Sequence, residues 1–149
     1  MKERLEYGNR TLDDLTFLDE VTKQTLRNFV ARLKEAEGDN LAQVALFGSM
    51  ARGDCDEDSD TDVFVLLKEG IPREKRHQIS DIAFDATGEI SGWRVELSPL
   101  VESVKELDEE YKGVPWRRLE PVLQEIQKDG VLLYDAAGYQ QNSADTALS

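Results

Sequence analysis

Two short apolar segments set the strongest constraint on the fold. Residues 41–47 (LAQVALF) and 60–67 (DTDVFVLL) each predict a buried strand, the second because it is rich in β-branched residues. Gly48-Ser49 interrupts the first segment, and the next residues are typical of a short helix that Gly53 stops. Residues 54–59 then form an acidic loop. The sequence therefore predicts two core strands joined by a short helix and a loop.

Helical periodicity fills most of the remaining chain. A first helix is expected from Thr11, which has capping-box spacing to Asp14, and Gly38 and the two residues after it are expected to end it. Residues 73–87 and 115–128 have apolar positions at helical spacing and predict two further helices. Gly88 is a plausible stop for the helix before it.

Two more strands complete the expected sheet. Residues 93–98 (WRVELS) alternate in polarity and predict a third strand that Pro99 ends, and residues 131–134 predict a fourth. Residues 100–113 are acidic and ambiguous, a lid or a short helix. The alternation of helices and strands predicts an α/β (α+β) fold with a small mixed sheet flanked by helices.

The length of 149 residues predicts one domain with a substantial core. Its expected bounds are residues 11–134. Residues 135–149 lack periodicity and predict a disordered C-terminal tail.

Composition excludes several classes of function. The net charge of −13, from 18 basic and 31 acidic residues, disfavours nucleic acid and suits a cation or a basic protein partner, although it also fits solubility alone. Cys55 and His77 are single, which excludes a disulfide framework and sites built from several cysteines or histidines. No apolar run long enough for a membrane helix and no secretory signal are present, so we expect a cytoplasmic protein without membrane contact.

Carboxylates are the first candidates for chemistry. Asp60 and Asp62 alternate along a strand and point to one face, where two close carboxylates repel each other unless a cation lies between them. Oxygen ligands favour Mg²⁺ or Mn²⁺. Glu96 joins them if the strands at 60–67 and 93–98 are neighbours; otherwise it is an exposed glutamate.

The Gly-Ser turn is expected to lie beside these acids and to supply the phosphate-binding end of the same site. A strand followed by Gly48, Ser49 and a helix start leaves backbone N–H groups free for a phosphate, and Ser49 adds a hydroxyl donor. Arg52 either binds a phosphate or forms a salt bridge with the acidic loop, and the sequence favours neither.

Other signals have simpler interpretations. The alternating aspartates from Asp54 to Asp62 resemble a calcium loop, but Ser59 and Val65 stand where that loop needs glycine and glutamate. Trp93 and Trp116 are interpreted as core anchors rather than ligand-stacking residues.

Gly-Ser, ten intervening residues and Asp-x-Asp on an apolar strand together resemble the DNA polymerase β-like nucleotidyltransferase superfamily, in particular its minimal nucleotidyltransferases (MNT). The matching residues are Gly48, Ser49, Ala51, Arg52, Gly53, Ser59, Asp60 and Asp62, and Glu96 corresponds to the family's third acid. Residues 128–134 (KDGVLLY) are similar to the segment that closes many such domains. This chain departs from the pattern in having Glu96 where small members usually have Asp.

The resemblance implies a function. Asp60, Asp62 and Glu96 would hold two Mg²⁺ (or Mn²⁺) ions, Glu96 would assist proton removal, and Gly48 and Ser49 would hold the β- and γ-phosphates of a nucleoside triphosphate, with ATP as the expected donor. NMP would pass to an acceptor hydroxyl and pyrophosphate would leave.

The acceptor is less constrained. Small members resemble antitoxins paired with HEPN-domain ribonuclease toxins, and some transfer AMP to a toxin tyrosine, so a HEPN-domain protein is the expected partner. Two alternatives remain: a small-molecule (aminoglycoside-like) nucleotidyltransferase, and a non-catalytic antitoxin that binds its toxin. The sequence leaves the nucleotide and the oligomeric state, including a homo-oligomer, open.

Overall fold

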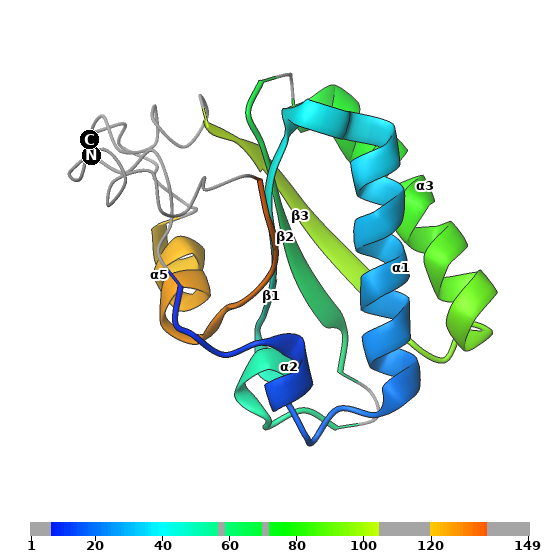
Figure 1. The fold of residues 1–149 in the computed structure, drawn as a ribbon, viewed down its shortest axis with the longest axis vertical. Coiled ribbons are helices and arrows are strands. Elements are labelled where there is room, and N and C mark those ends of the chain that lie inside the picture. The colour runs from blue at the N-terminus through cyan, green and yellow to red at the C-terminus, as the bar shows by residue number, and fades with distance from the viewer. Residues whose placement is uncertain (1–6, 57–58, 70–71, 105–119, 137–149) are drawn as a thin grey trace.

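The protein is described by a computed structural model over residues 7–56, 59–69, 72–104 and 120–136. The elements in chain order are η1 (Leu12–Asp14), α1 (Glu20–Glu37), η2 (Gly38–Asn40), β1 (Leu41–Phe47), α2 (Ser49–Arg52), β2 (Thr61–Leu67), α3 (Pro72–Ala86), η3 (Thr87–Ser91), β3 (Leu97–Ser103), α5 (Glu120–Asp129) and β4 (Val131–Asp135). The strands form one sheet in the order β3-β2-β1-β4 (Figure 1). β2 and β3 are parallel and the other two pairs are antiparallel, which confirms the predicted mixed sheet.

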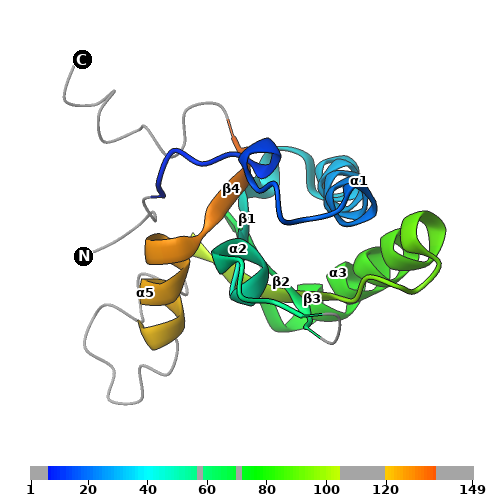
Figure 2. The ribbon, with the colours of Figure 1, turned by 90° about the horizontal axis from the view of Figure 1, so that it is seen from below.

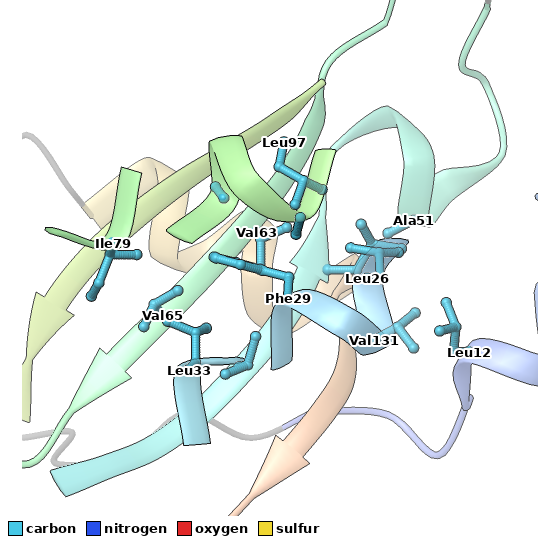
Figure 3. Packing of buried hydrophobic residues seen from close by; sticks show 14 of the residues in the cluster. Leu12, Leu26, Phe29, Leu33, Ala51, Val63, Val65, Ile79, Leu97 and Val131 are labelled. Carbon is cyan, nitrogen blue, oxygen red and sulfur yellow. The ribbon is translucent and has the colours of Figure 1, made fainter. Parts of the chain in front are cut away.

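Helices cover the sheet on both faces. α1 and α3 lie on one face and α5 lies on the other, as the two perpendicular views agree (Figures 1 and 2). On the α1–α3 face, Leu26, Phe29 and Leu33 of α1 pack with Ile79 of α3 over Val65 of β2 (Figure 3). Burial of these side chains removes apolar surface from water and supplies the main stabilisation of the fold.

The α5 face has a smaller core. Its buried residues are Ala42, Ala45, Phe47, Phe64, Leu66, Leu123 and Ile126. Along β2, Val63 and Val65 therefore face α1 and α3, whereas Asp62 and Phe64 are the alternate positions on the α5 side. Asp62 thus shares one face of β2 with Phe64, opposite Val63 and Val65.

The beginning of the first helix differs from the prediction. The capping box of Thr11 and Asp14 is present, but it closes only the 3₁₀ turn η1. α1 begins at Glu20, where the side chain of Asp19 accepts a hydrogen bond from the backbone N–H of Thr22 at 2.8 Å. The apolar spacing does not distinguish a short turn followed by a helix from one continuous helix.

The third strand begins four residues later than predicted. Residues 93–96 precede β3, which runs through Pro99 to Ser103. The backbone N–H of Thr61 donates to the carbonyl of Glu96 at 2.8 Å, so the backbone groups of Glu96 face β2. Every second residue counted from Glu96 faces β2 in the same way. Pro99 is three residues after Glu96, and its backbone groups therefore face the outer edge of the sheet. Because β3 is an edge strand and Pro99 needs no donor on that side, proline does not end it.

Gly88 does not end the helix either. A π-helical turn, η3, continues α3 to Ser91, and Gly92 with a positive φ of 60° ends it. The prediction failed because Gly88 has a packing role: a Cβ added there would lie 2.5 Å from the Trp93 ring.

The remaining elements agree with the sequence analysis. β1 has the predicted bounds, α2 ends at Gly53 as expected, and β4 extends to Asp135. The tail beyond residue 136, the ambiguous segment after residue 104 and the start of the helix predicted from residue 115 lie outside the described residues. No helix within the described ranges combines the length and apolarity needed to cross a bilayer.

Candidate active site

The end of β1 and the beginning of β2 bring the Gly-Ser turn against the Asp-x-Asp pair. Phe47 pairs with Asp62 across the two strands, so the next residue, Gly48, lies beside the Asp62 side chain. Gly48 has φ 78° and ψ −158°, and a Cβ at this position would lie 2.5 Å from Oδ2 of Asp62. Only glycine allows this backbone conformation and this close approach. The predicted proximity of the two motifs is thus present in the structure.

The first turn of α2 is anchored on Gly48. Its carbonyl accepts hydrogen bonds from the N–H groups of Ala51 and Arg52 at 3.0 and 3.1 Å. Ala51 is fully buried, whereas Ser49 is partly exposed at the start of the helix. The first N–H groups of a helix lack carbonyl partners within it, so the turn has donors of the kind that an anion accepts from, and its binding of a phosphate stays a prediction.

Asp62 lies in a negatively charged environment. Burial raises the pKa of its carboxyl above the ordinary value, and the negative charges of Asp60 and Glu125 raise this pKa further, while Arg52 acts in the opposite direction. Asp60 itself is exposed at the start of β2. A site where acids outweigh bases in this way favours a cation.

Arg52 forms salt bridges in this structure. Its Nε lies 3.2 Å from the carboxylate of Asp54 in the acidic loop, and its Nη1 lies 2.7 Å from that of Glu125 in α5. Of the two predicted roles for Arg52, the salt bridge is therefore the one observed. A phosphate contact by the same guanidinium would have to compete with two carboxylates.

The backbone of Glu96 lies next to that of the Asp60–Asp62 segment, but the Glu96 side chain is exposed. Its carbonyl accepts from Thr61, between Asp60 and Asp62, and it immediately precedes β3. The strands that carry the acids are neighbours, as the sequence analysis required. Within the described ranges, however, no three Asp, Glu, His or Cys side chains are grouped closely enough to hold a metal ion.

Asp60 and Asp62 therefore fit a divalent cation, whereas Glu96 in its present orientation does not complete the site. Asp60 and Asp62 supply oxygen ligands of the kind that Mg²⁺ prefers. Burial and, after it, neighbouring negative charge raise the pKa of Asp62, and a cation would offset that charge. Glu96 has the right chemistry and a neighbouring backbone, and its exposed side chain would have to turn toward the two aspartates to join them.

Two features of the site were not predicted. Glu125 has no local sequence signal, because only the packing of α5 beside α2 brings it to Arg52.

A cavity of about 520 Å³ on the other side of β2 is lined by Ser59, Thr61 and Glu96 among others. Thr61 is fully buried there, and its hydroxyl has no hydrogen-bond partner in the described structure.

Comparison with known proteins identifies relatives of this chain. Residues 26–129 match the Nucleotidyltransferase domain family, a span that contains the Gly-Ser turn, the Asp-x-Asp pair and Glu96. "Putative protein adenylyltransferase MJ0141" of Methanocaldococcus jannaschii is 42% identical over 64 residues, which are 43% of this chain and 61% of that protein. "Putative protein adenylyltransferase MJ1305" of the same organism is 26% identical over 127 residues, covering 83% of this chain and 79% of that protein.

The fold also matches a solved structure. A crystal structure of a variant MntA–HpeT toxin–antitoxin has a TM-score of 0.51 at 14% identity, and the alignment covers 82% of this chain and 83% of that chain. At this identity the likeness concerns the fold alone. The family match spans well over half of the sequence and both motifs, and it confirms the resemblance inferred from them. The chain belongs to the nucleotidyltransferase domain family.

Proposed function

We propose that this protein transfers AMP from ATP to a hydroxyl group of a partner protein, as the antitoxin of a toxin–antitoxin pair with a HEPN-domain toxin. The observation that carries this proposal is the contact between Gly48 and Asp62, which joins a phosphate-binding turn to an acidic pair across β1 and β2. The names of the two M. jannaschii relatives support a protein acceptor, and the toxin–antitoxin complex of similar fold supports a toxin as that acceptor.

The side chains and backbone have separate roles in this reaction. Gly48 and Ser49 bind the β- and γ-phosphates through N–H groups and the Ser49 hydroxyl. The acceptor oxygen attacks the α-phosphorus, the bond from that phosphorus to the bridging oxygen breaks, and pyrophosphate leaves with the bonding electron pair. Glu96 accepts the proton of the attacking hydroxyl.

A protein with one unpaired cysteine and a nucleoside triphosphate substrate would work in the cytoplasm.

Asp60, Asp62 and Glu96 are the residues that would hold divalent cations. When bound, Mg²⁺ or Mn²⁺ would stabilise negative charge on the attacking and leaving oxygens. Asp62 is positioned for this by the strand pairing with Phe47 and by Gly48, which keeps the carboxylate beside the turn that binds phosphate.

A labelling experiment tests the proposal. The protein is incubated with ATP labelled at the α-phosphate, Mg²⁺ and a candidate HEPN-domain protein, sought first among the products of neighbouring genes, and label on the acceptor is measured. We expect transfer that the double variant Asp60→Ala, Asp62→Ala reduces by about a thousand-fold or more. A matched double variant, Glu35→Ala, Asp39→Ala, removes two exposed acids outside the site and should transfer normally.

A second function has an observation in its favour. Because the Glu96 side chain is exposed and no three-acid group is formed in the described residues, the chain also fits an antitoxin that binds its toxin without catalysis. Toxin neutralisation in cells separates the two. If the Asp60→Ala, Asp62→Ala variant neutralises the toxin as well as the unmodified protein does, binding is sufficient and the proposal that transfer neutralises the toxin is wrong.

A further inference from the structure

Two aromatic side chains lie exposed between α3 and β3. Phe84 is 62% exposed and Trp93 is 57% exposed, and their ring centroids are 4.4 Å apart. Trp93 was predicted to anchor the core, and the structure places it at the surface instead. Large aromatic side chains that remain in water while touching each other form an apolar patch, which is typical of interaction surfaces.

The backbone holds Trp93 in this exposed position. Among the described residues, Trp93 is the single non-glycine with a positive φ, at 73°. The hydroxyl of Ser91 donates to the carbonyl of Thr87 at 2.7 Å and accepts from the N–H of Val95 at 3.0 Å, which fixes the turn on both sides of Trp93. Gly88 leaves room for the indole. A bulky residue kept in a strained conformation points to a functional constraint.

The patch borders the candidate active site. Phe84 and Trp93 line a recess of about 280 Å³ together with Glu96, the proposed third acid. This volume is below the range of roughly 300–1,000 Å³ that is usual for ligand pockets. The recess therefore suits one side chain of a larger partner rather than a whole small molecule.

The charges around the recess are acidic. Asp81 and Asp85 are exposed on α3 next to Phe84, and Glu96 is exposed beside Trp93. Arg94 is also near, but it is paired with Asp19 at 3.1 Å. Within the described residues, no ion pair is formed by Asp81, Asp85 or Glu96. Together with the net charge of −13, this surface attracts cationic side chains and repels phosphate groups.

We propose that Phe84 and Trp93 dock a basic segment of the acceptor protein, with an arginine or lysine stacked on the indole and the flanking hydroxyl directed toward Glu96. This inference rests on the proposed transfer to a protein and adds the surface that selects the acceptor. Arginine combines a flat cation that stacks on aromatic faces with hydrogen bonds to carboxylates, so it matches both the rings and the acids of this patch.

Peptide binding measured by calorimetry without nucleotide tests the proposal. The probes are a twelve-residue synthetic peptide with one tyrosine flanked by arginines, the same peptide with glutamates in place of the arginines, and a single-stranded RNA of similar length. We expect the arginine peptide to bind, and the glutamate peptide and the RNA to bind about ten-fold more weakly or not at all.

Variants locate the binding site. Trp93→Gly removes the ring while relieving the positive φ, so it should fold and should weaken binding of the arginine peptide about ten-fold. The double variant Asp81→Asn, Asp85→Asn should weaken the same binding and reduce its dependence on salt. The double variant Glu35→Gln, Asp39→Asn removes equal charge from exposed positions outside the patch and serves as the matched control.

Several results would overturn the docking site: no binding of the arginine peptide, tighter binding of RNA, unchanged binding by Trp93→Gly, or an equal effect of the control. The calorimetry uses no nucleotide, so its outcome does not depend on catalysis. Peptide binding without any label transfer would refute the proposed function and leave the docking site supported. Label transfer without selective peptide binding would support the proposed function and refute the docking site.

Discussion

The turn after β1 and the turn after α3 each place a glycine close to one side chain, that of Asp62 or that of Trp93. An added Cβ would approach the two side chains equally closely. A Cβ on Gly48 would lie 2.5 Å from the Asp62 carboxylate, and a Cβ on Gly88 would lie 2.5 Å from the Trp93 ring. The surroundings differ. Asp62 is fixed within a strand between two partners, whereas Trp93 extends into solvent from a loop.

This difference separates two kinds of constraint. At Gly48 the positive φ would strain any other residue, whatever position the Asp62 carboxylate takes, so the constraint lies in the backbone. At Gly88 the obstacle is the outer edge of an exposed ring that can rotate outward. We conclude that the Gly48 turn is constrained by its backbone conformation, whereas the aromatic patch is constrained by a side chain that can adapt to a partner.

The largest expected effect comes from Gly48→Ala. Left-handed strain and the clash with Asp62 should lower the free energy of unfolding by about 3 kcal/mol and abolish label transfer. Gly92→Ala is the reference for a positive φ without a clash: Gly92 has φ 60° and ψ 39°, a left-handed conformation that other residues adopt at lower cost than that of Gly48, and it should lose about 1 kcal/mol. Urea denaturation measures both. Equal losses for the two variants would mean that neither the backbone conformation of Gly48 nor its approach to Asp62 adds a constraint beyond the positive φ.

Gly88→Ala should have a smaller effect. Alanine favours the helical turn, and this gain offsets the weaker packing of the two rings once the indole moves outward, so stability should change by less than about 1 kcal/mol. Trp93 fluorescence, recorded in a Trp116→Phe background, should shift as the ring leaves Phe84. A destabilisation as large as that of Gly48→Ala would contradict the proposed adaptability of the patch.

Asp62→Asn should stabilise the fold slightly while it abolishes transfer. The pKa of Asp62 is raised in the folded state, so ionisation opposes folding as the pH rises through that pKa, and this penalty is absent at low pH. The variant should gain about 0.5 kcal/mol at neutral pH, since solvent screens the half-buried carboxylate, and nothing below about pH 4. Thermal unfolding at several pH values checks the sign; a gain that grows toward acid pH would refute it.

The smallest effect concerns Arg52 and Glu125. A double-mutant cycle with Arg52→Gln and Glu125→Gln should give a small coupling energy that falls with added salt, because water and ions screen both exposed side chains. If Arg52 also binds phosphate, Glu125→Gln should lower the KM for ATP by releasing the guanidinium. An unchanged KM would leave Arg52 with the structural role alone.

The two regions also differ in how far the sequence determined them. Around Gly48, the glycine, the short helix and the strands are specified by neighbouring residues, and their predictions were confirmed. Around Trp93, the result depends on tertiary packing that no local pattern encodes. The π-turn continues because Gly88 accommodates a ring five residues later, and Pro99 is tolerated because its strand lies at an edge. The predicted core role of Trp93 failed for the same reason.

The position of Pro99 has a consequence for assembly. Its nitrogen faces the open side of β3 and carries no hydrogen, so a strand from another molecule laid along that side would lack one donor in the middle of the pairing. The missing donor disfavours sheet extension by a copy of the protein along this side of β3, which is an edge strand among the described residues. A partner that approaches here would have to be recognised by side chains, not by added β-structure.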